Sequence, residues 1–408
     1  MRERGAAYVV GTFDTKGDEL RYVAGLIREA GVPVLTVDVG TKSDASDVDV
    51  RAAEVAAHHP DGASAVVGAG DRGVAVTAMT EALRRWIDTR DDVGGMIGLA
   101  GSGGTAIVTP AMRSLPIGTP KLMVSTLAAG DMSAYVGIHD ITTMFPVTDV
   151  AGLNRISRVV LGNAAHALAG MMLRQPPSVV DDKPSLGLTM FGVTTPCVTA
   201  LSAALSGEYD CQVFHANGHG GRALEALVEA GLVSGVVDIS TTEVVDLLFG
   251  GVCSAGPERL DAIARTGVPW IGSVGAFDMV NFWARDTVPE RYAGRRFHVH
   301  NANVTLMRTT AEENRQAGAW LADKLNLSPG PVRLLLPEGG VSMLDAAGQP
   351  FHDPEADAAL FEAIEARFRP SDSHRLMRMP YHINDPAFAA AVASEVRQLL
   401  SNRKELSA

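Results

Sequence analysis

The chain has few cysteines, and their spacing fits neither a metal site nor a disulfide framework. Cys197, Cys211 and Cys253 are the three cysteines in 408 residues, and no pair shows the Cys-x-x-Cys spacing of zinc and redox motifs. Structural zinc and a disulfide scaffold are therefore not expected. The sequence predicts three reduced thiols, as in a cytoplasmic protein.

Excess positive charge is absent as well. Lys and Arg number 35 against 47 Asp and Glu, so the net charge is −12. No basic stripe interleaved with aromatic residues occurs, and aromatic residues make up 5% of the chain. Nucleic acid is therefore not an expected partner, because binding its phosphate backbone depends on clustered Lys and Arg. A single anion can still bind locally, through backbone N–H groups and a magnesium ion.

Several well-known catalytic signatures are missing. The glycine and lysine spacing matches no Walker A loop, and the chain has neither a zinc-helix motif nor a Gly-x-Ser-x-Gly elbow. The N-terminus is short and charged and leads directly into an apolar run, so neither a signal peptide nor a membrane span is expected.

Apolar, strand-like runs alternate with helical patterns through most of the chain. Strands are predicted at residues 6–10, 34–37, 94–99, 121–125, 186–191, 211–215 and 332–336. A stretch rich in proline and charge, residues 174–184, interrupts the alternation and predicts a linker. The sequence therefore predicts an α/β fold of two facing, doubly wound, Rossmann-like parallel-sheet subdomains, residues 1–178 and 185–408, with a cleft between them.

A glycine-rich turn within residues 98–105 (GLAGSGGT) follows one predicted strand and precedes a helix. This arrangement places free backbone N–H groups and the positive end of a helix dipole at one point, which favours an anion such as phosphate. Glycine also lets a ligand approach the backbone closely. The alternative is a tight turn that only packs the strand against the helix.

A second, more polar turn follows the first predicted strand. Thr12, Thr15 and Lys16 suit phosphate oxygens, and Asp14 suits a magnesium ion or its water shell. The alternative is that Asp14 or Thr15 only caps the following helix.

Other polar residues lie at the ends of neighbouring predicted elements. Asp38 ends the second strand, where an acidic residue often contacts a ribose hydroxyl, although a turn or cap role is equally open. Ser125 and Thr126 end the fourth strand. Arg72 opens a helix and suits a phosphate clamp or a surface ion pair. Because parallel sheets bind ligands at the carboxyl ends of their strands, we expect one shared site there.

The second half holds candidates for acid–base chemistry. His215 precedes an Asn-Gly pair, Glu243 follows a Ser-Thr-Thr turn, and Asp278 follows a predicted strand. His298 and His300 alternate along another segment. Such groups can transfer protons or bind a metal ion, and a structural role is the alternative for each of them.

Eight motifs in register resemble one known family. They are residues 11–17 (GTFDTKG), 71–73 (DRG), 101–105 (GSGGT), 115–126 (LPIGTPKLMVST), 149–154 (DVAGLN), 215–221 (HANGHGG), 238–243 (DISTTE) and 382–385 (HIND). With them the chain resembles the Tm-1-like ATP-binding family, bacterial and fungal proteins similar to the N-terminal half of the plant protein that resists tomato mosaic virus. The resemblance spans nearly the whole chain.

The resemblance implies ATP binding, two α/β subdomains and self-association as a homodimer or higher homo-oligomer, but no known reaction. It implies nucleotide contacts by Thr12, Asp14, Thr15, Lys16, Gly101, Gly103, Gly104 and Thr105. The strand-end and helix-start positions add Asp38, Arg72, Ser102, Ser125 and Thr126 to these candidates. The plant proteins carry an additional barrel domain, which suggests that a separate barrel-domain partner protein supplies it here.

We therefore expect an ATP-dependent enzyme. The first lobe would bind ATP with Mg²⁺, which Asp14 helps to place, and the second would bind a small metabolite, for example a carboxylate. Glu243, His215 and Asp278 are its candidate catalytic residues, and phosphoryl transfer or substrate activation is the expected chemistry. The alternatives are a nucleotide-binding interaction protein without turnover and a sugar-nucleotide-dependent transferase.

Overall fold

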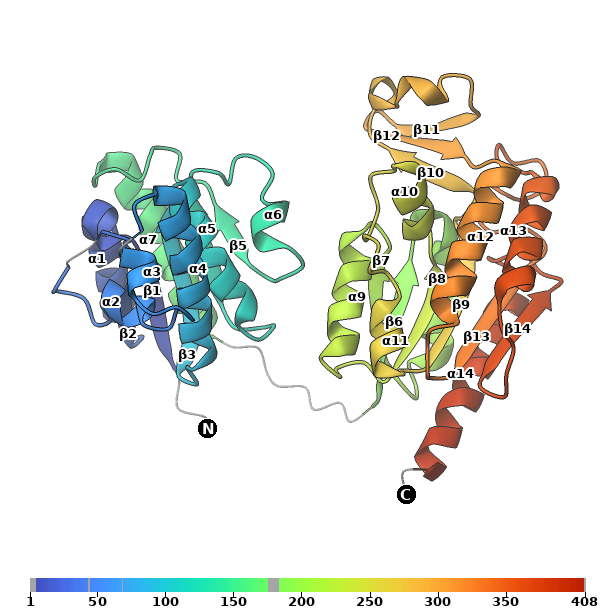
Figure 1. Ribbon diagram of the computed structural model, residues 1–408, viewed down its shortest axis with the longest axis horizontal. Helices are drawn as coiled ribbons and strands as arrows, with labels where there is room; N and C mark the ends of the chain where they lie inside the picture. The colour runs from blue at the N-terminus through green and yellow to red at the C-terminus, as the bar shows by residue number, and fades with distance from the viewer. Residues whose placement is uncertain (1–4, 43–44, 68, 175–182, 407–408) are drawn as a thin grey trace. The chain divides into compact units, whose positions relative to one another are not determined.

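The chain divides into two compact units, Met1–Val179 and Val180–Ala408, in a computed structural model (Figure 1). The structure describes residues 5–42, 45–67, 69–174 and 183–406. Each unit is built on a parallel sheet, so the predicted two-domain α/β fold is confirmed. The cleft between the units stays a prediction, and the linker at residues 174–184 lies largely outside the described residues.

The sheet of unit 1 has five parallel strands in the order β2-β1-β3-β4-β5. The strands are β1 (Ala6–Gly11), β2 (Val34–Asp38), β3 (Val93–Ala100), β4 (Lys121–Ser125) and β5 (Thr142–Met144). The chain starts inside the sheet, moves outward to β2 and then crosses to the other side of β1. The winding direction therefore reverses between β1 and β3, and such switch points are where open α/β sheets bind ligands.

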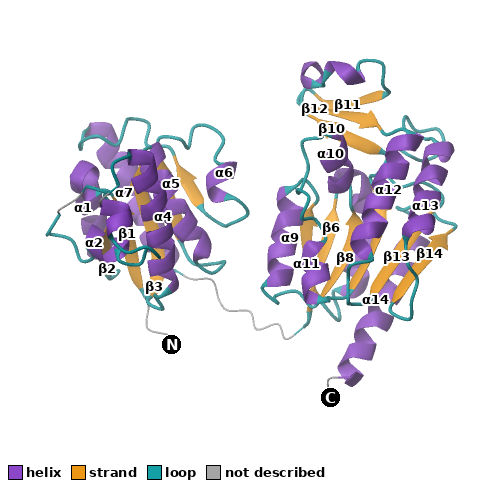
Figure 2. Cartoon of the chain, viewed as in Figure 1, coloured by secondary structure: helices purple, strands orange, loops and turns teal. Residues whose placement is uncertain are grey.

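Helices cover both faces of this sheet (Figure 2). One core cluster joins α1 and α7 to one face, and a second joins α2, α4 and α5 to the other. The helices are α1 (Phe13–Glu29), α2 (Ala52–Ala56), α3 (Ser64–Val67), α4 (Arg72–Asp88), α5 (Ser102–Ser114), α6 (Ser133–Val136) and α7 (Arg155–Leu173). Because α1 and α5 leave the sheet on opposite faces, the ends of β1 and β3 are left uncovered between them.

Helix α7 is the one described helix long and apolar enough to span a membrane, judged by length and composition alone. Leu161, Ala165 and Leu168 of α7 are fully buried in the core of unit 1. Packing against the sheet therefore explains the apolar composition of α7.

The helices around the carboxyl edge of the sheet begin in different ways. Asp71 caps α4, since its Oδ1 accepts the N–H of Val74 at 3.0 Å. Asn154 caps α7 by accepting the N–H groups of Ile156 and Ser157. Helix α5 instead follows Gly101 without a side-chain cap. The first N–H groups of α5 therefore remain available to another acceptor.

The sheet of unit 2 repeats this topology with one more strand. Its order is β14-β13-β9-β8-β6-β7, which from the β7 end is second, first, third, fourth, fifth and sixth along the chain. The strands are β6 (Ser185–Met190), β7 (Asp210–His215), β8 (Gly235–Ser240), β9 (Trp270–Gly275), β13 (Val332–Pro337) and β14 (His374–Met379). An antiparallel sheet in the order β10-β12-β11, with β10 (Met279–Phe282), β11 (Phe297–Asn301) and β12 (Val304–Arg308), is inserted between β9 and β13.

Helices also cover both faces of the six-stranded sheet. Helices α8 and α14 share one core cluster, and α9 to α13 share the other. The helices are α8 (Thr195–Leu205), α9 (His219–Glu229), α10 (Glu243–Phe249), α11 (Asp261–Thr266), α12 (Ala311–Leu325), α13 (Pro354–Arg367) and α14 (Pro386–Leu406), with short 3-10 helices η1 (Gly192–Thr194), η2 (Arg285–Thr287) and η3 (Glu290–Tyr292). The two units are thus doubly wound in the same way, each around its own core.

A chain of residues 1–179 alone should fold, because its sheet and both of its core clusters use residues of unit 1 only. Circular dichroism should show mixed α/β structure that melts in one cooperative transition. A fragment that stays unfolded while the full chain folds would contradict this independence.

Candidate functional site

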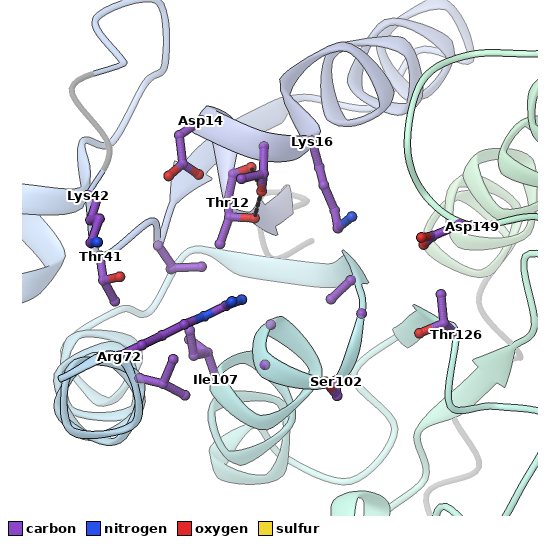
Figure 3. Close-up of a pocket in the computed structure, with 17 residues that line it drawn as sticks. Thr12, Asp14, Lys16, Thr41, Lys42, Arg72, Ser102, Ile107, Thr126 and Asp149 are labelled. Atoms are coloured by element: carbon purple, nitrogen blue, oxygen red, sulfur yellow. Dashed lines mark hydrogen bonds between the residues drawn. The ribbon is translucent and has the colours of Figure 1, made fainter.

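A pocket of about 560 Å³ opens at the carboxyl edge of the unit 1 sheet (Figure 3). This volume lies within the roughly 300–1,000 Å³ of typical small-molecule sites. The pocket is lined by Thr12, Asp14, Thr15, Lys16, Val39, Thr41, Lys42, Arg72, Val76, Ala100, Gly101, Ser102, Gly103, Gly104, Ile107, Thr126 and Asp149. The turns after β1 and β3 both contribute, so the pocket lies at the switch point of the sheet.

The structure brings most of the predicted nucleotide contacts to this one pocket. Those that line it are Thr12, Asp14, Thr15, Lys16, Arg72, Gly101, Ser102, Gly103, Gly104 and Thr126. They come from α1, α4, the start of α5 and the end of β4, which are far apart in the sequence. The shared site that the strand ends predict is therefore present as a cavity.

Three other predicted contacts, Asp38, Thr105 and Ser125, are buried and do not line the pocket. Asp38 accepts the N–H groups of Phe13 at 3.1 Å and Gly40 at 2.9 Å, so the structure assigns it the turn role. The Thr105 and Ser125 hydroxyls bond to each other at 2.7 Å, and Thr105 also donates to the carbonyl of Gly101. These side chains hold the turns in shape from behind the pocket.

Helices α1 and α5 both begin at the pocket and differ in what occupies their N-termini. At α1, Asp38 accepts the N–H of Phe13, and the N–H of Thr15 donates to the carbonyl of Thr12 at 3.2 Å. No side chain caps α5, whose first turn contains Gly103 and Gly104. An anion in the pocket would therefore find unfilled donors and a positive dipole end at α5 rather than at α1.

Gly103 and Gly104 of this turn differ in the space around them. A Cβ on Gly104 would lie 2.7 Å from the Cβ of Ala100, so only glycine fits there without a shift of the helix. A Cβ on Gly103 would meet no atom closer than Nη2 of Arg72, at 4.0 Å. Position 103 therefore faces open pocket space, with the guanidinium of Arg72 at its edge.

Three cations line a pocket in a chain of net charge −12. Neither Arg72 nor Lys42 forms an ion pair with a described residue, so the surface ion pair considered for Arg72 is not formed. The ammonium of Lys16 donates to the carbonyl of Val150 at 2.5 Å. The pocket thus offers two unpaired cations and a third that is held by one backbone oxygen.

Asp14 and Asp149 supply the carboxylates of the pocket. Burial, and then the charge of Asp38 nearby, raises the pKa of Asp14. Oδ2 of Asp38 is itself buried without a hydrogen-bond partner. The negative charges of Asp14 and Asp38 therefore repel one another on this side of the pocket.

Sequence reasoning missed seven of the lining residues. Val39, Val76 and Ile107 form an apolar wall. The periodicity of apolar residues in helices and strands does not show which of them contact a ligand. Thr41 ends the strand-end segment 38–41, to which the rule that strand ends bind ligands already applies, and Lys42 is the next residue.

In unit 2, the side chain of the predicted catalytic residue Glu243 is surrounded by hydrogen-bond donors of the protein itself. Its side chain is buried, its Oε1 accepts the N–H groups of Gly218 at 2.7 Å and Gly221 at 3.1 Å, and its Oε2 accepts from Arg259 at 2.8 Å. A Cβ on Gly221 would lie 2.1 Å from Oε2 of Glu243. The glycines after β7 thus let α9 close on this carboxylate, and geometry supports a structural role for Glu243.

Asp278, the second predicted catalytic residue, is buried in another cluster. It accepts from the Ser342 hydroxyl at 2.7 Å, while its Oδ1 has no partner. Burial is the largest cause that raises its pKa to about 6. Arg308 is the cation of this cluster and contacts Asp345 and Asp357. Asp278 is therefore not open to a substrate in this structure.

His215, the third, is exposed at the end of β7, where its ring stacks on Phe191 at a centroid distance of 5.3 Å. His298 packs edge-on against Phe351, and His300 is exposed on β11. Among the described residues no group of three or more His, Cys, Asp or Glu side chains is arranged to hold a metal ion. The three predicted catalytic residues thus have separate surroundings instead of forming one acid–base site.

Known protein families and relatives match this chain along nearly its whole length. The N-terminal domain model of the uncharacterised protein family UPF0261 matches residues 5–177, and its C-terminal domain model matches residues 183–400. A UPF0261 protein of Mesorhizobium japonicum is 59% identical over 387 residues, which cover 95% of this chain and 97% of that protein. A UPF0261 protein of Clostridium tetani is 41% identical over 399 residues, 96% of this chain and 98% of that protein.

A plant protein is also similar, over part of its length. The ToMV resistance protein Tm-1(GCR237) of Solanum lycopersicum is 41% identical over 417 residues. The match covers 96% of this chain but 55% of the tomato protein. The tomato protein therefore contains a large region with no counterpart in this chain.

Replacing Asp345 with Asn should reduce the pH dependence of folding stability. Burial, and then the charges of Asp278 and Asp357, raises the pKa of Asp345 to about 9, and Asp345 hydrogen-bonds to Asp357. The folded protein keeps this proton at neutral pH, whereas the unfolded chain loses it above about pH 4. The free energy of unfolding of the wild type therefore falls as pH rises from about 4 to 9.

Asn has no proton to lose, so the variant should lose this part of the dependence. Between pH 5 and pH 8 its free energy of unfolding should fall less steeply than that of the wild type, because a proton that only the folded state retains contributes about 1.4 kcal/mol per pH unit. Urea unfolding at several pH values measures this, with Asp372→Asn, at an exposed position, as the control. Equal slopes for Asp345→Asn and the wild type would contradict the prediction.

Proposed function

The chain belongs to the uncharacterised protein family UPF0261, as its resemblance to Tm-1-like proteins predicts, and we propose that its unit 1 binds ATP together with Mg²⁺. One observation carries the proposal: the uncapped N-terminus of α5 faces a pocket at the switch point of the sheet, with Arg72 and Lys16 in its wall. Backbone N–H groups, a helix dipole and two cations are what a chain of phosphates requires.

The pocket offers a place for each part of the nucleotide. The phosphates would contact the N–H groups at Gly103 and Gly104, with Arg72 beside them. Val39, Val76 and Ile107 supply an apolar wall for the base. Mg²⁺ takes oxygen ligands from one or two carboxylates and from phosphates, and the pocket offers the carboxylates of Asp14 and Asp149 on opposite sides. The ion would neutralise phosphate charge.

We further propose that the ATP is used by an enzyme. Phosphoryl transfer or ATP-dependent activation of a small, for example carboxylated, metabolite fits a site that works by positioning and charge neutralisation. His215 is the most accessible of the three candidate acid–base residues in unit 2 and would act on that metabolite. The protein would act in the cytoplasm as a homo-oligomer. The region that the tomato relative has in addition suggests a separate barrel-domain partner protein.

A nucleotide-binding interaction protein without turnover is the second candidate. Glu243 and Asp278 are buried among their own hydrogen-bond partners, which leaves His215 as the one exposed residue of the three acid–base candidates. A relative is named a resistance protein rather than an enzyme. Steady-state phosphate release, measured with ATP and a panel of carboxylated metabolites, separates the two candidates: turnover favours the enzyme, and binding without turnover favours the interaction protein.

Replacing Gly103 with Asp should weaken ATP binding. A Cβ fits at this position, so the fold should be kept, and the new carboxylate would lie beside Arg72 where we place the phosphates. Like charges about 4 Å apart repel by roughly 1–4 kcal/mol between bulk water and a protein surface. Isothermal titration calorimetry with ATP and Mg²⁺ should show a corresponding rise in Kd.

Gly103→Asn is the matched control, because it adds nearly the same volume without the charge. It should bind ATP more tightly than Gly103→Asp, and both variants should unfold at the wild-type temperature. Equal ATP affinity of Gly103→Asp and the wild type would rule out phosphate at this turn. No binding to the wild type would remove the ATP assignment.

A further inference from the structure

The far end of the nucleotide pocket is formed by two residues of opposite charge. In Figure 3, Lys16 and Asp149 extend from different segments and point toward one another, next to Thr126. Lys16 donates to the backbone carbonyl of Val150 rather than to the carboxylate of its neighbour. The space between an ammonium and a carboxylate suits a phosphate that carries a divalent cation, since each half of that group then faces its opposite charge.

The segment that carries Asp149 is held in place at several points. The N–H of Gly152 donates to Oε1 of Glu19, whose side chain is buried. Val150 packs into the same core cluster as α1 and α7. Lys16, which donates to the carbonyl of Val150 in this segment, has non-helical backbone angles within α1 (φ −135° and ψ 24°). These contacts give Asp149 a defined position although its own side chain is exposed.

The carboxylate of Asp149 keeps one oxygen for a ligand. Its Oδ1 accepts the N–H of Val150 at 2.7 Å. Its Oδ2 has no hydrogen-bond partner among the described residues. A cation could therefore bind Oδ2 without breaking a bond that holds the segment in place.

Asp14, the other carboxylate of the pocket, is differently placed. It projects on the side of Lys42, away from Thr126 (Figure 3). Burial, and then the charge of Asp38, raises the pKa of Asp14, so its charged form is disfavoured. Asp14 lies on the side of the pocket opposite to Asp149, away from the space between Asp149 and Lys16 (Figure 3).

On these grounds, and resting on the proposed binding of ATP, we infer that Asp149 is the carboxylate that holds the divalent cation of the bound nucleotide. Lys16 faces the same terminal phosphate from the opposite wall. The assignment of the cation to Asp149 orients the nucleotide along the pocket. Its terminal phosphate lies between Lys16 and Asp149, and its base points toward Val39, Val76 and Ile107.

The test compares ATP binding with excess Mg²⁺ and with EDTA, by isothermal titration calorimetry, in the full-length wild type, Asp149→Asn and Asp14→Asn. In the wild type, Mg²⁺ should lower the Kd of ATP, so that the ratio of the Kd in EDTA to the Kd in Mg²⁺ is about ten for each 1.4 kcal/mol that the cation contributes. In Asp149→Asn this ratio should fall close to one, while the Kd in EDTA stays equal or improves because a negative charge is gone. Asn can still accept the N–H of Val150, so this variant should melt at the wild-type temperature.

Asp14→Asn removes the competing carboxylate and should keep a Kd for ATP that Mg²⁺ lowers, and Asp91→Asn, at an exposed position outside the pocket, is the matched control with the wild-type ratio. A ratio that persists in Asp149→Asn, or is lost in Asp14→Asn alone, overturns the inference and assigns the cation to the Lys42 side. Equal ATP binding by the wild type with and without Mg²⁺ also overturns it but leaves the proposed ATP site standing. Absence of ATP binding under both conditions removes the proposed function itself.

Discussion

The account of unit 1 depends on one set of unfilled hydrogen-bond donors, the backbone N–H groups at the start of α5. Asp71 and Asn154 cap the neighbouring helices α4 and α7, whereas the turn before α5 offers Gly101, Ser102 and Gly103 and no side-chain cap. Glycine here is required by close packing at position 104 and leaves room at position 103. The same residues that bring β3 and α5 together therefore keep the donors open to a ligand.

Unit 2 has the same winding, but a side chain of the protein itself occupies the N-terminus of one of its helices. At α9, Glu243 accepts the N–H groups of Gly218 and Gly221, and Arg259 neutralises it. The protein's own carboxylate thus takes the place that an external anion would take. A glycine-rich motif is consistent with either outcome, and what decides between them is whether an acidic side chain from another segment reaches the helix start.

The fold and part of the candidate site could be predicted from the sequence. Periodicity and strand ends predicted the α/β fold and placed Thr12, Lys16 and Gly103 near one another, because parallel sheets align their carboxyl ends. Residue type alone could not separate an accessible carboxylate from a buried one: the surroundings of Glu243 and Asp278 depend on Arg259 and Ser342, which folding brings to them. Lining residues such as Val76 and Ile107 belong to apolar helix faces, whose periodicity indicates core packing and gives no sign of a ligand contact.

Hydrogen–deuterium exchange of the full-length protein, with and without ATP and Mg²⁺, tests the central claim most directly. The account predicts slower exchange at the N–H groups of residues 101–105 and 12–16 when the nucleotide is present. It predicts no change at residues 218–221, where Glu243 already accepts the N–H groups. Unchanged exchange at residues 101–105 in the presence of bound ATP would contradict the claim that the open start of α5 holds the phosphates.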